Sequence, residues 1–264
     1  MANIENGSYK IEFKRATTDR ETQFVPISSI HRHACQQVLA GRYYEPYTHD
    51  IIARLLLERP GNMVHAGTFF GDMLPSFSRK CPGTVYAFEP VLEHYVLAKL
   101  CVQKNGLENV ILLNSGLGAE FSSAYIDTGE TKGSHLGGAS QIAETGELTA
   151  LVPIDAFDLQ DISIVQLDVE GFELEALKGA IKTITTNQPS ILIEDNAGAC
   201  SEFLAARGYE QIGTIPCLFI GDIPCLSVWS PADRVASISE VFSAYEENAD
   251  SIPSVGPNNR NESS

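Results

Sequence analysis

The sequence predicts a doubly wound α/β fold around a mainly parallel seven-stranded sheet, and three observations support this fold class. Between residues 62 and 230, short β-rich runs alternate with longer helical patterns, which is typical of stacked βαβ units. The first β-rich runs are continuously apolar, so helices are expected to cover both faces of the sheet. Of the 264 residues, 44% are hydrophobic, and this composition suits one sizeable domain with additions.

The expected strands are spaced widely enough for a helix to follow most of them. Five short apolar runs supply the first strands: residues 63–66, 84–88, 110–113, 162–167 and 191–193. After the fourth run, Leu174 and Leu177 lie on one face of a helix that ends before Pro189. Residues 209–214 and 225–229 are joined by a turn that contains Gly and Pro, which predicts a C-terminal antiparallel hairpin and completes seven strands.

Three segments lie outside this alternation. The segment before the core is expected to be an irregular extension, and a Gly/Ser/Thr-rich insertion loop interrupts the core. After the core, the capping box Ser237-x-x-Glu240 predicts a final helix, and the tail from Pro253 is expected to be disordered. We therefore expect an N-terminal extension at residues 1–50 and a core domain at residues 51–235, whose insertion loop spans 119–153. A C-terminal helix with its tail occupies residues 236–264.

Charge and composition argue against several classes of partner. With 18 basic and 34 acidic side chains, the net charge of -16 repels a phosphate backbone, so no nucleic-acid partner is expected. The chain has no signal-peptide pattern at its start and no run of roughly 18 apolar residues, so we expect a soluble cytoplasmic protein without a membrane partner. The six cysteines form no CxxC pair, and reduced core thiols are preferred over disulfides or a zinc site. The oligomeric state is left open.

A glycine-containing turn follows the first expected strand. Gly67 and Gly71 stand four residues apart, where glycine lets the backbone approach a ligand and Gly71 can open the next helix. Such a pair is common in turns, so by itself it fits a purely structural role equally well. Glu89 ends the second strand about 20 residues further on, where a doubly wound fold can hydrogen-bond ribose hydroxyls. Together, the turn and the carboxylate indicate a nucleotide-like cofactor.

Four sequence blocks carry a resemblance to a known family. They are Val64-His65-Ala66-Gly67-x-x-x-Gly71-Asp72, Phe88-Glu89-Pro90, Asn105-Gly106-Leu107-x-Asn109-Val110, and Leu167-Asp168-Val169-Glu170-Gly171-Phe172-Glu173 with Leu177-Lys178-Gly179-Ala180. Over roughly residues 43–194 the chain resembles the FkbM-type S-adenosylmethionine-dependent methyltransferases, and the last block is the most specific. The resemblance implies a Rossmann-like methyltransferase fold, S-adenosyl-L-methionine as methyl donor, and O-methylation of a hydroxyl on a sugar or glycosylated natural product.

The resemblance also implies where the donor binds. It places the two glycines at the methionine end, Glu89 at the ribose, and Asn114 or Ser115 near the adenine. The donor-binding candidates all lie near the ends of the first four strands: His65, Gly67, Thr68, Gly71, Asp72, Glu89, Asn114, Ser115 and Asp168.

The chain departs from this family in the turn itself. His65 stands where the family usually has an aspartate, and Phe69 and Phe70 replace small residues. A histidine can make one hydrogen bond there, but it cannot offer negative charge to the ammonium group of the donor. Two interpretations stay open: His65 contacts the donor directly, or it only packs in the strand while water supplies the contact.

Acidic side chains follow the fourth and fifth strands. Methyl transfer from a sulfonium requires an aligned acceptor oxygen whose proton is removed or weakened. Asp168 and Glu170 follow the fourth strand and are our catalytic candidates, while Glu194, Asp195 and Asn196 follow the fifth. Both strands are expected to end at the edge of the sheet where doubly wound folds bind ligands. Carboxylates gathered there require a cation or a proton.

Two accounts of these acids stay open. Asp168, Asp195 and Asn196 resemble the magnesium-binding set of cation-dependent O-methyltransferases such as catechol O-methyltransferase. This predicts a divalent ion that binds the acceptor hydroxyl, and oxygen-only ligands favour Mg²⁺, Ca²⁺ or Mn²⁺. In the alternative, Asp168 and Glu170 cap the helix that starts near Phe172, and the Asp195-Asn196 pair merely begins a loop.

Without a metal, a general base is needed. His135 is preferred to His33 and His49 because its Gly-rich loop is long enough to cover an acceptor, although an exposed histidine without a role is the simpler interpretation. The aromatic run at residues 43–47 either packs the extension, which we favour, or walls the donor or acceptor site.

Two other function classes stay open. A nicotinamide-dependent oxidoreductase shares the glycine turn and the acid, but we find no Tyr-Lys or hydride-site constellation, and the block at residues 168–180 argues against it. A degenerate relative that only binds ligands would be consistent with His65. The expected partner is a small-molecule or saccharide acceptor, and the insertion and the N-terminal extension are expected to determine which one.

Overall fold

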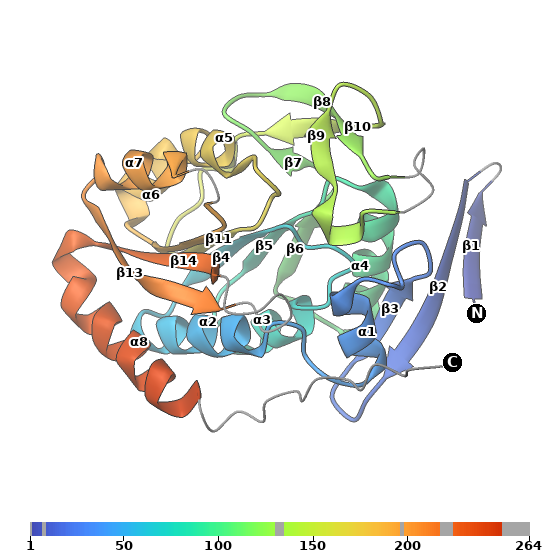
Figure 1. Ribbon diagram of the computed structural model, residues 1–264, viewed down its shortest axis with the longest axis horizontal. Coiled ribbons are helices and arrows are strands. Elements are labelled where there is room, and N and C mark those ends of the chain that lie inside the picture. Colours follow the sequence, from blue (N-terminus) through green and yellow to red (C-terminus); the bar gives the residue numbers. More distant parts are fainter. Residues whose placement is uncertain (1, 7–8, 130–134, 196–197, 217–223, 250–264) are drawn as a thin grey trace, which may run out of the picture.

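The computed structural model contains a central sheet with helices on both faces (Figure 1). It describes five stretches of the chain: residues 2–6, 9–129, 135–195, 198–216 and 224–249. The prediction of a disordered tail from Pro253 lies outside these stretches. Among the described helices, none is long and apolar enough to cross a membrane.

The central sheet has seven strands in the order β13-β14-β12-β11-β4-β5-β6. Its strands are β4 (Asn62–Ala66), β5 (Val85–Phe88), β6 (Val110–Leu113), β11 (Ile162–Leu167), β12 (Ser190–Ile193), β13 (Tyr209–Pro216) and β14 (Pro224–Pro231). Only β14 opposes the common direction, because it pairs antiparallel with both β12 and β13. The predicted hairpin is therefore confirmed, and the sheet as a whole is mixed rather than purely parallel.

The strand order reverses between β4 and β11, which pair in parallel. From β4 the chain continues to β5 and β6 on one side, whereas from β11 it continues to β12 on the other. The helices that follow the two strands therefore cover opposite faces, and a crevice opens beyond the carboxyl ends of the strands. This reversal fixes the position of the site before any side chain is considered.

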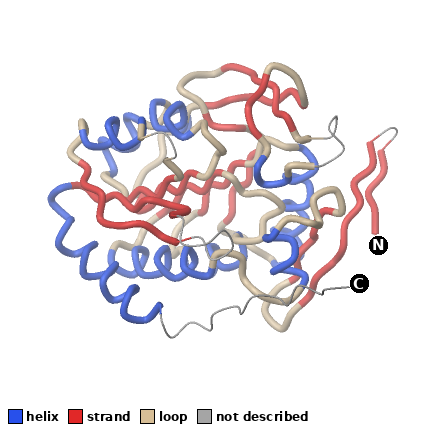
Figure 2. The backbone as a smooth tube through the Cα atoms, viewed as in Figure 1, coloured by secondary structure: helices blue, strands red, loops and turns tan. Residues whose placement is uncertain are grey.

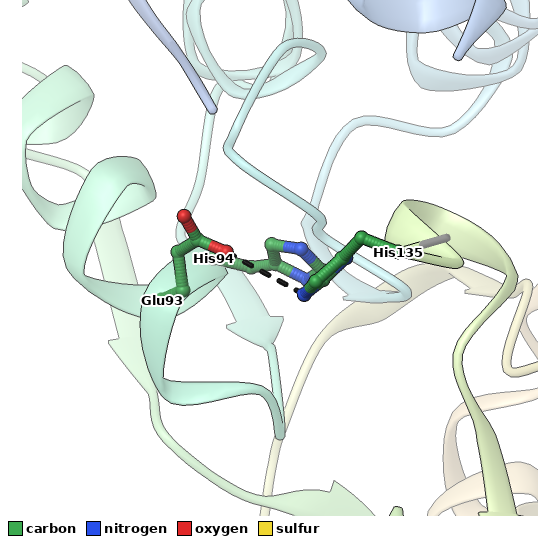
Figure 3. Close-up of side chains that lie close together, drawn as sticks. All are labelled: Glu93, His94 and His135. Atoms are coloured by element: carbon green, nitrogen blue, oxygen red, sulfur yellow. Dashed lines mark ion pairs between the residues drawn. The ribbon is translucent and has the colours of Figure 1, made fainter. Parts of the chain in front are cut away.

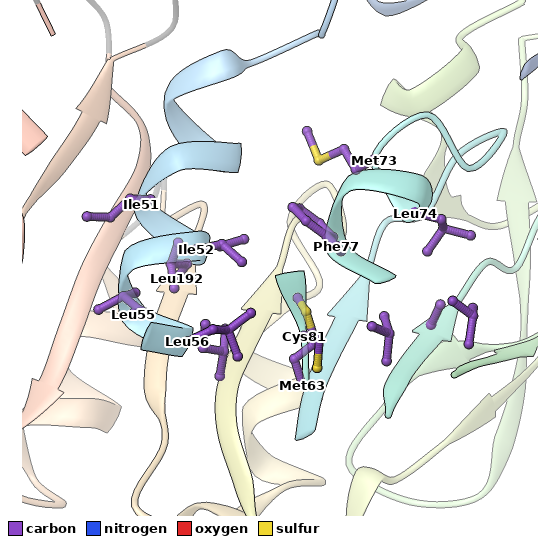
Figure 4. Packing of buried hydrophobic residues seen from close by; sticks show 14 of the residues in the cluster. Ile51, Ile52, Leu55, Leu56, Met63, Met73, Leu74, Phe77, Cys81 and Leu192 are labelled. Atoms are coloured by element: carbon purple, nitrogen blue, oxygen red, sulfur yellow. The ribbon is translucent and has the colours of Figure 1, made fainter. Parts of the chain in front are cut away.

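Two layers of helices bury the continuously apolar strands, as predicted from their composition. All six residues of β11 are buried, because helices cover it on both sides. One layer holds α2 (Pro46–Glu58), α3 (Leu74–Lys80), α4 (Leu92–Asn105) and α8 (Val235–Ala249); the other holds α5 (Glu173–Lys178), α6 (Ile181–Asn187) and α7 (Ala199–Ala205). Figure 4 shows part of the first core, in which Leu55 and Phe77 belong to one buried cluster with Met63 and Leu192 of the sheet.

The N-terminal extension is regular, and the expectation of irregular chain is wrong. It forms an antiparallel sheet of β1 (Ala2–Asn6), β2 (Tyr9–Thr17) and β3 (Thr22–Pro26), followed by α1 (His33–Leu39). In β2, Ile11 and Phe13 are buried between exposed charged residues, the period-two pattern of a half-buried strand. This apolar face packs against Leu97 and Cys101 of α4, so the extension is a layer of the same body.

The insertion also contains a sheet where a loop was expected. Four short strands pair in the order β7-β10-β8-β9, and strands appear in red in Figure 2. Their bounds are β7 (Gly116–Leu117), β8 (Ser122–Asp127), β9 (Gln141–Ala143) and β10 (Glu147–Val152). The described residues also contain three 3₁₀ turns: η2 (Gly137–Ala139) between β8 and β9, η3 (Ile154–Phe157) after β10, and η4 (Ala232–Arg234) after β14. The strands escaped prediction because they are short and largely exposed, so they lack an apolar run.

The final helix is confirmed, but not its predicted cap. The helix α8 begins at Val235, and its Ile238 and Phe242 are buried in the first core. Ser237 therefore lies within the first turn, and its hydroxyl donates to Glu58 and to the carbonyl of Arg234. The short connection from β14 starts the helix earlier than the sequence pattern indicated.

Candidate active site

The turn after β4 depends on Gly67 for a close approach of two strand ends. Gly67 has a φ of 85°, and a Cβ atom there would overlap the carbonyl oxygen of Asp168, which follows β11. Gly71 also has a φ of 85°, but its absent side chain would meet Ala98 of α4 at 3.0 Å. Gly67 thus lies at the crevice, whereas Gly71 serves the packing of the turn against α4 and does not itself open α3.

Glu89 holds this turn in place. Its side chain is 4% exposed, and its two carboxylate oxygens accept the backbone N–H groups of Phe69 at 2.7 Å and Val91 at 2.9 Å. Phe69 has a φ of 51°, an unusual conformation for a bulky residue, and the bond from Glu89 stabilises it. Oε2, which accepts only the N–H of Phe69 among the described bonds, retains a further lone pair, so Glu89 can still accept a hydroxyl group of a ligand.

Two connected cavities open at the reversal of the strand order. The smaller has a volume of about 60 Å³ and lies under the insertion, next to Glu89 and Ser115. The larger has a volume of about 450 Å³ and lies next to His65 and Asp72. The two share four lining residues: Gly67, Gly138, Asp168 and Glu170. One elongated ligand can therefore occupy both, with its middle at the ends of β4 and β11.

Three buried polar atoms near these cavities have no hydrogen-bond partner among the described residues. They are Nε2 of His65, Oγ1 of Thr68 and Oγ of Ser115. Buried polar groups in native proteins are nearly always paired, so unpaired ones beside a cavity point to a ligand or to water. Ser115 lines the smaller cavity and His65 the larger, which spreads these groups along the whole crevice.

His65 is neutral and held in one orientation. It is 1% exposed, its ring packs edge-on against Phe77, and its Nδ1 contacts Oε1 of Gln166 on the neighbouring strand. Burial lowers the pKa of His65 to about 4. Because Nδ1–H donates to the Gln166 oxygen, Nε2 carries a lone pair beside the larger cavity. His65 can therefore accept a hydrogen bond from a cationic ligand without supplying negative charge.

Three carboxylates converge where the cavities meet. One oxygen from each of Asp168, Glu170 and Glu194 lies within 4.8 Å of the others. Burial raises the pKa of Glu170 to about 7, with the nearby Glu194 and Glu173 adding to the shift, and burial also raises the pKa of Asp168 well above its usual value. Glu170 has a φ of 54°, a strained conformation that is characteristic of functional sites. The cluster is built to hold a proton or a cation.

The structure overturns the predicted metal ligand Asp195. Its carboxylate accepts the hydroxyl of Ser201 at 2.7 Å and the N–H groups of Ser201 and Cys200, so it caps α7 instead of facing the crevice. Burial raises the pKa of Asp195, but the bonds from Ser201 outweigh it and hold the pKa below its usual value. Asn196 lies outside the described residues.

Asp168 and Glu170 do not cap α5 either. Among the described residues, the side chain at the N-cap of α5 makes no capping bond. Glu173, the first residue of α5, turns its Oε1 back to the loop and accepts the N–H groups of Val169 at 2.9 Å and Gly171 at 3.2 Å. The capping alternative for the first two acids is therefore wrong, and both remain available to a ligand.

His135 does not reach the crevice. Its Nδ1 accepts the N–H of Gly137 at 3.1 Å, and its Nε2 lies 3.6 Å from Glu93. It lines a third cavity of about 480 Å³ on the side of α4. Its preferred role as general base is therefore not supported by its position. His49 is buried against Tyr43 and Phe77, whereas His33 does line the larger cavity.

A comparison with known families decides to which protein family the chain belongs. A sequence model described as the Methyltransferase FkbM domain matches residues 65–211, more than half of the chain. The chain belongs to the FkbM methyltransferase family. The family resemblance predicted from the sequence is therefore confirmed.

One solved methyltransferase structure shares its fold at low sequence identity, and others match it more weakly. The FkbM methyltransferase of Methylobacillus flagellatus KT is 17% identical, with a TM-score of 0.50 over 65% of this chain and 43% of that one. The match thus spans less than half of that relative. An O-methyltransferase from Bacillus cereus in complex with SAH is 12% identical, with a TM-score of 0.47 over 70% of this chain and 81% of that one. An rRNA methylase from Streptococcus thermophilus is 16% identical, with a TM-score of 0.44 over 70% of this chain and 93% of that one. No curated protein matches the sequence.

Most of the predicted donor-binding residues of this FkbM family member line the two cavities. Glu89 and Ser115 line the smaller cavity, and His65, Gly67, Asp72 and Asp168 line the larger. Thr68 is buried behind the turn with its hydroxyl unpaired among the described residues. Asn114 is a correction, because its amide donates to the carbonyls of Glu89 and Pro90 and so shapes the turn after β5.

The N-terminal extension, which we expect to help determine the acceptor, lines the larger cavity. His31, Arg32, His33 and Tyr44 all line it. In a chain with only 18 basic residues, the His-Arg-His run at residues 31–33 was the available signal, and it was not used. Tyr44 lies in the aromatic run at residues 43–47, for which we favoured packing of the extension. It lines the larger cavity and also packs against two buried clusters.

Proposed function

We propose that this methyltransferase transfers a methyl group to a hydroxyl of a sugar or glycosylated natural product bound in the larger cavity. One observation carries the proposal: Asp168 and Glu170, whose pKa values are raised, line both cavities at the point where they meet. A donor in the crevice and an acceptor in the larger cavity would both contact this pair. The other polar groups around the larger cavity, such as Arg32, Asp72 and Gln166, suit an acceptor with several hydroxyls.

In this proposal, each end of the donor contacts a different set of residues. Glu89 and Ser115 suit the ribose and adenine at the smaller cavity, where Phe88 and Leu117 add apolar surface. The lone pair on Nε2 of His65 suits the ammonium group of the methionine end. When bound, S-adenosylmethionine supplies an electrophilic methyl group on a sulfonium.

Glu170 is the proton acceptor in this proposal. A hydroxyl oxygen attacks more readily when a positioned base removes its proton as the new bond forms, and a base is most effective when its pKa lies near the working pH. The pKa of Glu170 is raised to about 7. Asp168, within 4.8 Å, is placed to orient the same hydroxyl.

A divalent ion is the alternative way to activate the hydroxyl. With Asp195 committed to α7, the described groups that could hold the ion are Asp168, Glu170 and Glu194. All three offer oxygen, which suits Mg²⁺. The two accounts differ in EDTA: turnover that persists in excess chelator supports proton transfer to Glu170, and turnover that is lost and returns with Mg²⁺ supports the ion.

Ligand-dependent stability tests the proposal at the level of the cofactor. Thermal unfolding of the full chain is followed with S-adenosylhomocysteine or with NAD, and the first is expected to raise Tm because only the folded state binds it. Stabilisation by NAD alone, or by neither ligand, would refute the proposal. The acceptor class is then tested by mass spectrometry with sugar-bearing and sugar-free hydroxyl compounds, and methylation restricted to amines would contradict O-methylation.

A further inference from the structure

A second cluster of ligating side chains lies apart from the crevice. Glu93 and His94 begin α4, and His135 comes from the insertion just before η2 (Figure 3). One ligating atom from each lies within 4.8 Å of the others. The three side chains are 15%, 1% and 8% exposed, so the donor atoms are largely withdrawn from water. Two imidazoles and one carboxylate form a donor set typical of transition metals.

His94 supplies the strongest indication of a missing ligand. Its Nε2 is buried and has no hydrogen-bond partner among the described residues. Its Nδ1 lies 3.5 Å from Oε1 of Glu89, which favours the tautomer with the proton on Nδ1 and a lone pair on Nε2. Metal-binding histidines very often direct their second nitrogen at a carboxylate in this way, because it fixes the ring and makes it a better ligand.

The other two side chains are suitably placed. Nε2 of His135 lies 3.6 Å from Oε2 of Glu93, and two ligands of a tetrahedral ion with bonds of 2.0–2.1 Å are about 3.3 Å apart. The hydroxyl of Ser28 donates to the same oxygen at 2.7 Å and so orients the carboxylate. When Nε2 of His135 binds the ion, the ring proton moves to Nδ1. Nδ1 can then no longer accept the N–H of Gly137, and that hydrogen bond breaks.

The cluster also has access to solvent. The cavity of about 480 Å³ is lined by both Glu93 and His135, so an ion can enter from it and a water molecule can complete the coordination. We propose that Glu93, His94 and His135 bind a divalent transition ion of the zinc type, which links the insertion to α4. Imidazole nitrogen selects such ions over Mg²⁺.

Cobalt substitution tests this site directly. The full chain is freed of metal with chelator, dialysed and titrated with Co²⁺, whose visible bands report nitrogen and oxygen coordination, and Zn²⁺ is then added. We expect one equivalent of Co²⁺ to give the bands and Zn²⁺ to abolish them, while excess Mg²⁺ leaves them unchanged. Absence of the bands would overturn the proposal.

Four variants assign the bands to residues. His135→Ala and Glu93→Gln should each weaken Co²⁺ binding at least about tenfold, since even the loss of an outer partner of a metal ligand costs that much. His33→Ala removes an exposed histidine elsewhere, and Glu170→Gln disrupts the acidic cluster of the crevice; both should bind Co²⁺ like the wild type. Unchanged affinity in the first two variants would overturn the site. Circular dichroism of each metal-free variant verifies its fold, and the more exposed Glu93 serves if His135→Ala fails to fold.

Discussion

The strands β11 and β12 lie side by side and end at the same edge of the sheet, yet their acidic residues face different partners. After β11, Asp168 and Glu170 line the two cavities, and their pKa values are raised. After β12, Asp195 turns to the N–H groups of α7, and its pKa is lowered. The difference lies in the neighbouring hydrogen-bond groups, because Glu173 accepts the loop N–H groups of Val169 and Gly171 after β11. Asp168 and Glu170 are thereby left to line the cavities, whereas Asp195 itself accepts the N–H groups that follow β12.

Among the changes that test this difference between the two strand ends, replacing Glu170 should have the largest effect, a loss of turnover. In Glu170→Gln the proton acceptor is lost, and kcat should fall by about 10²–10⁴-fold. In the wild type, kcat/KM should rise with pH through about 7 as Glu170 loses its proton, and this limb should vanish in the variant. Steady-state kinetics across pH measure both effects.

The matched control for this variant is Glu175→Gln, which changes an exposed acid of the same length on α5. It should keep the wild-type pH profile. Wild-type turnover by Glu170→Gln would remove the residue from the mechanism.

The second-largest effect is expected where the two strand ends touch. Gly67→Ala places a methyl group against the carbonyl of Asp168 and strains a φ of 85°, so we expect a loss of at least about 2 kcal/mol in the free energy of unfolding. Gly171→Ala is a matched control, because Gly171 has a φ of 94° and nothing within 4 Å of the added atom. Urea unfolding compares the two, and equal losses would show that strain alone, without the contact, explains the effect.

A smaller effect is expected at the capping acid. Asp195→Ala should lower the free energy of unfolding by about 1 kcal/mol, because α7 loses its cap. Since folding lowers this pKa, the stabilisation is complete above the unfolded value of 3.8 and disappears as pH falls through the folded value. Urea unfolding at several pH values should show the difference from wild type shrinking in acid.

Asp195→Asn sharpens this test, since the amide oxygen keeps part of the cap and should restore part of the stability. Turnover should be unaffected by either change. A large loss of turnover with intact stability would return Asp195 to the site.

A further effect is the reverse pH dependence at Glu170. Its pKa is raised from 4.5 to about 7, so the folded state disfavours ionisation and wild-type stability should decline as pH rises between these values. The variant Glu170→Gln lacks this decline and should be more stable than the wild type at pH 8, with little such advantage at pH 5. Melting curves at the two pH values measure it, and an equal difference at both would contradict the raised pKa.

The sequence predicted those parts of the fold and site that follow from local pattern. The apolar run at residues 162–167 became β11 with every residue buried, and the turn at Gly67 and the acid Glu89 meet through the N–H of Phe69. Prediction from the sequence failed where the pattern of apolar residues was weak or where we overlooked it. The alternation in Tyr9–Thr17 indicated a strand that we overlooked, and the short strands of the insertion carried no apolar run.

By itself, then, the sequence determined where the strands of the central sheet lie along the chain and which residues follow each strand end. The reason is that the periodicity of apolar residues indicates which faces an element buries. Tertiary structure alone decided which partner each polar group chose. It turned Asp195 to α7, took His135 to Glu93, and brought Arg32 of the extension to the larger cavity. Such choices depend on distances between segments remote in the chain, where competing donors and acceptors differ by only about 1 kcal/mol and no local pattern records the outcome.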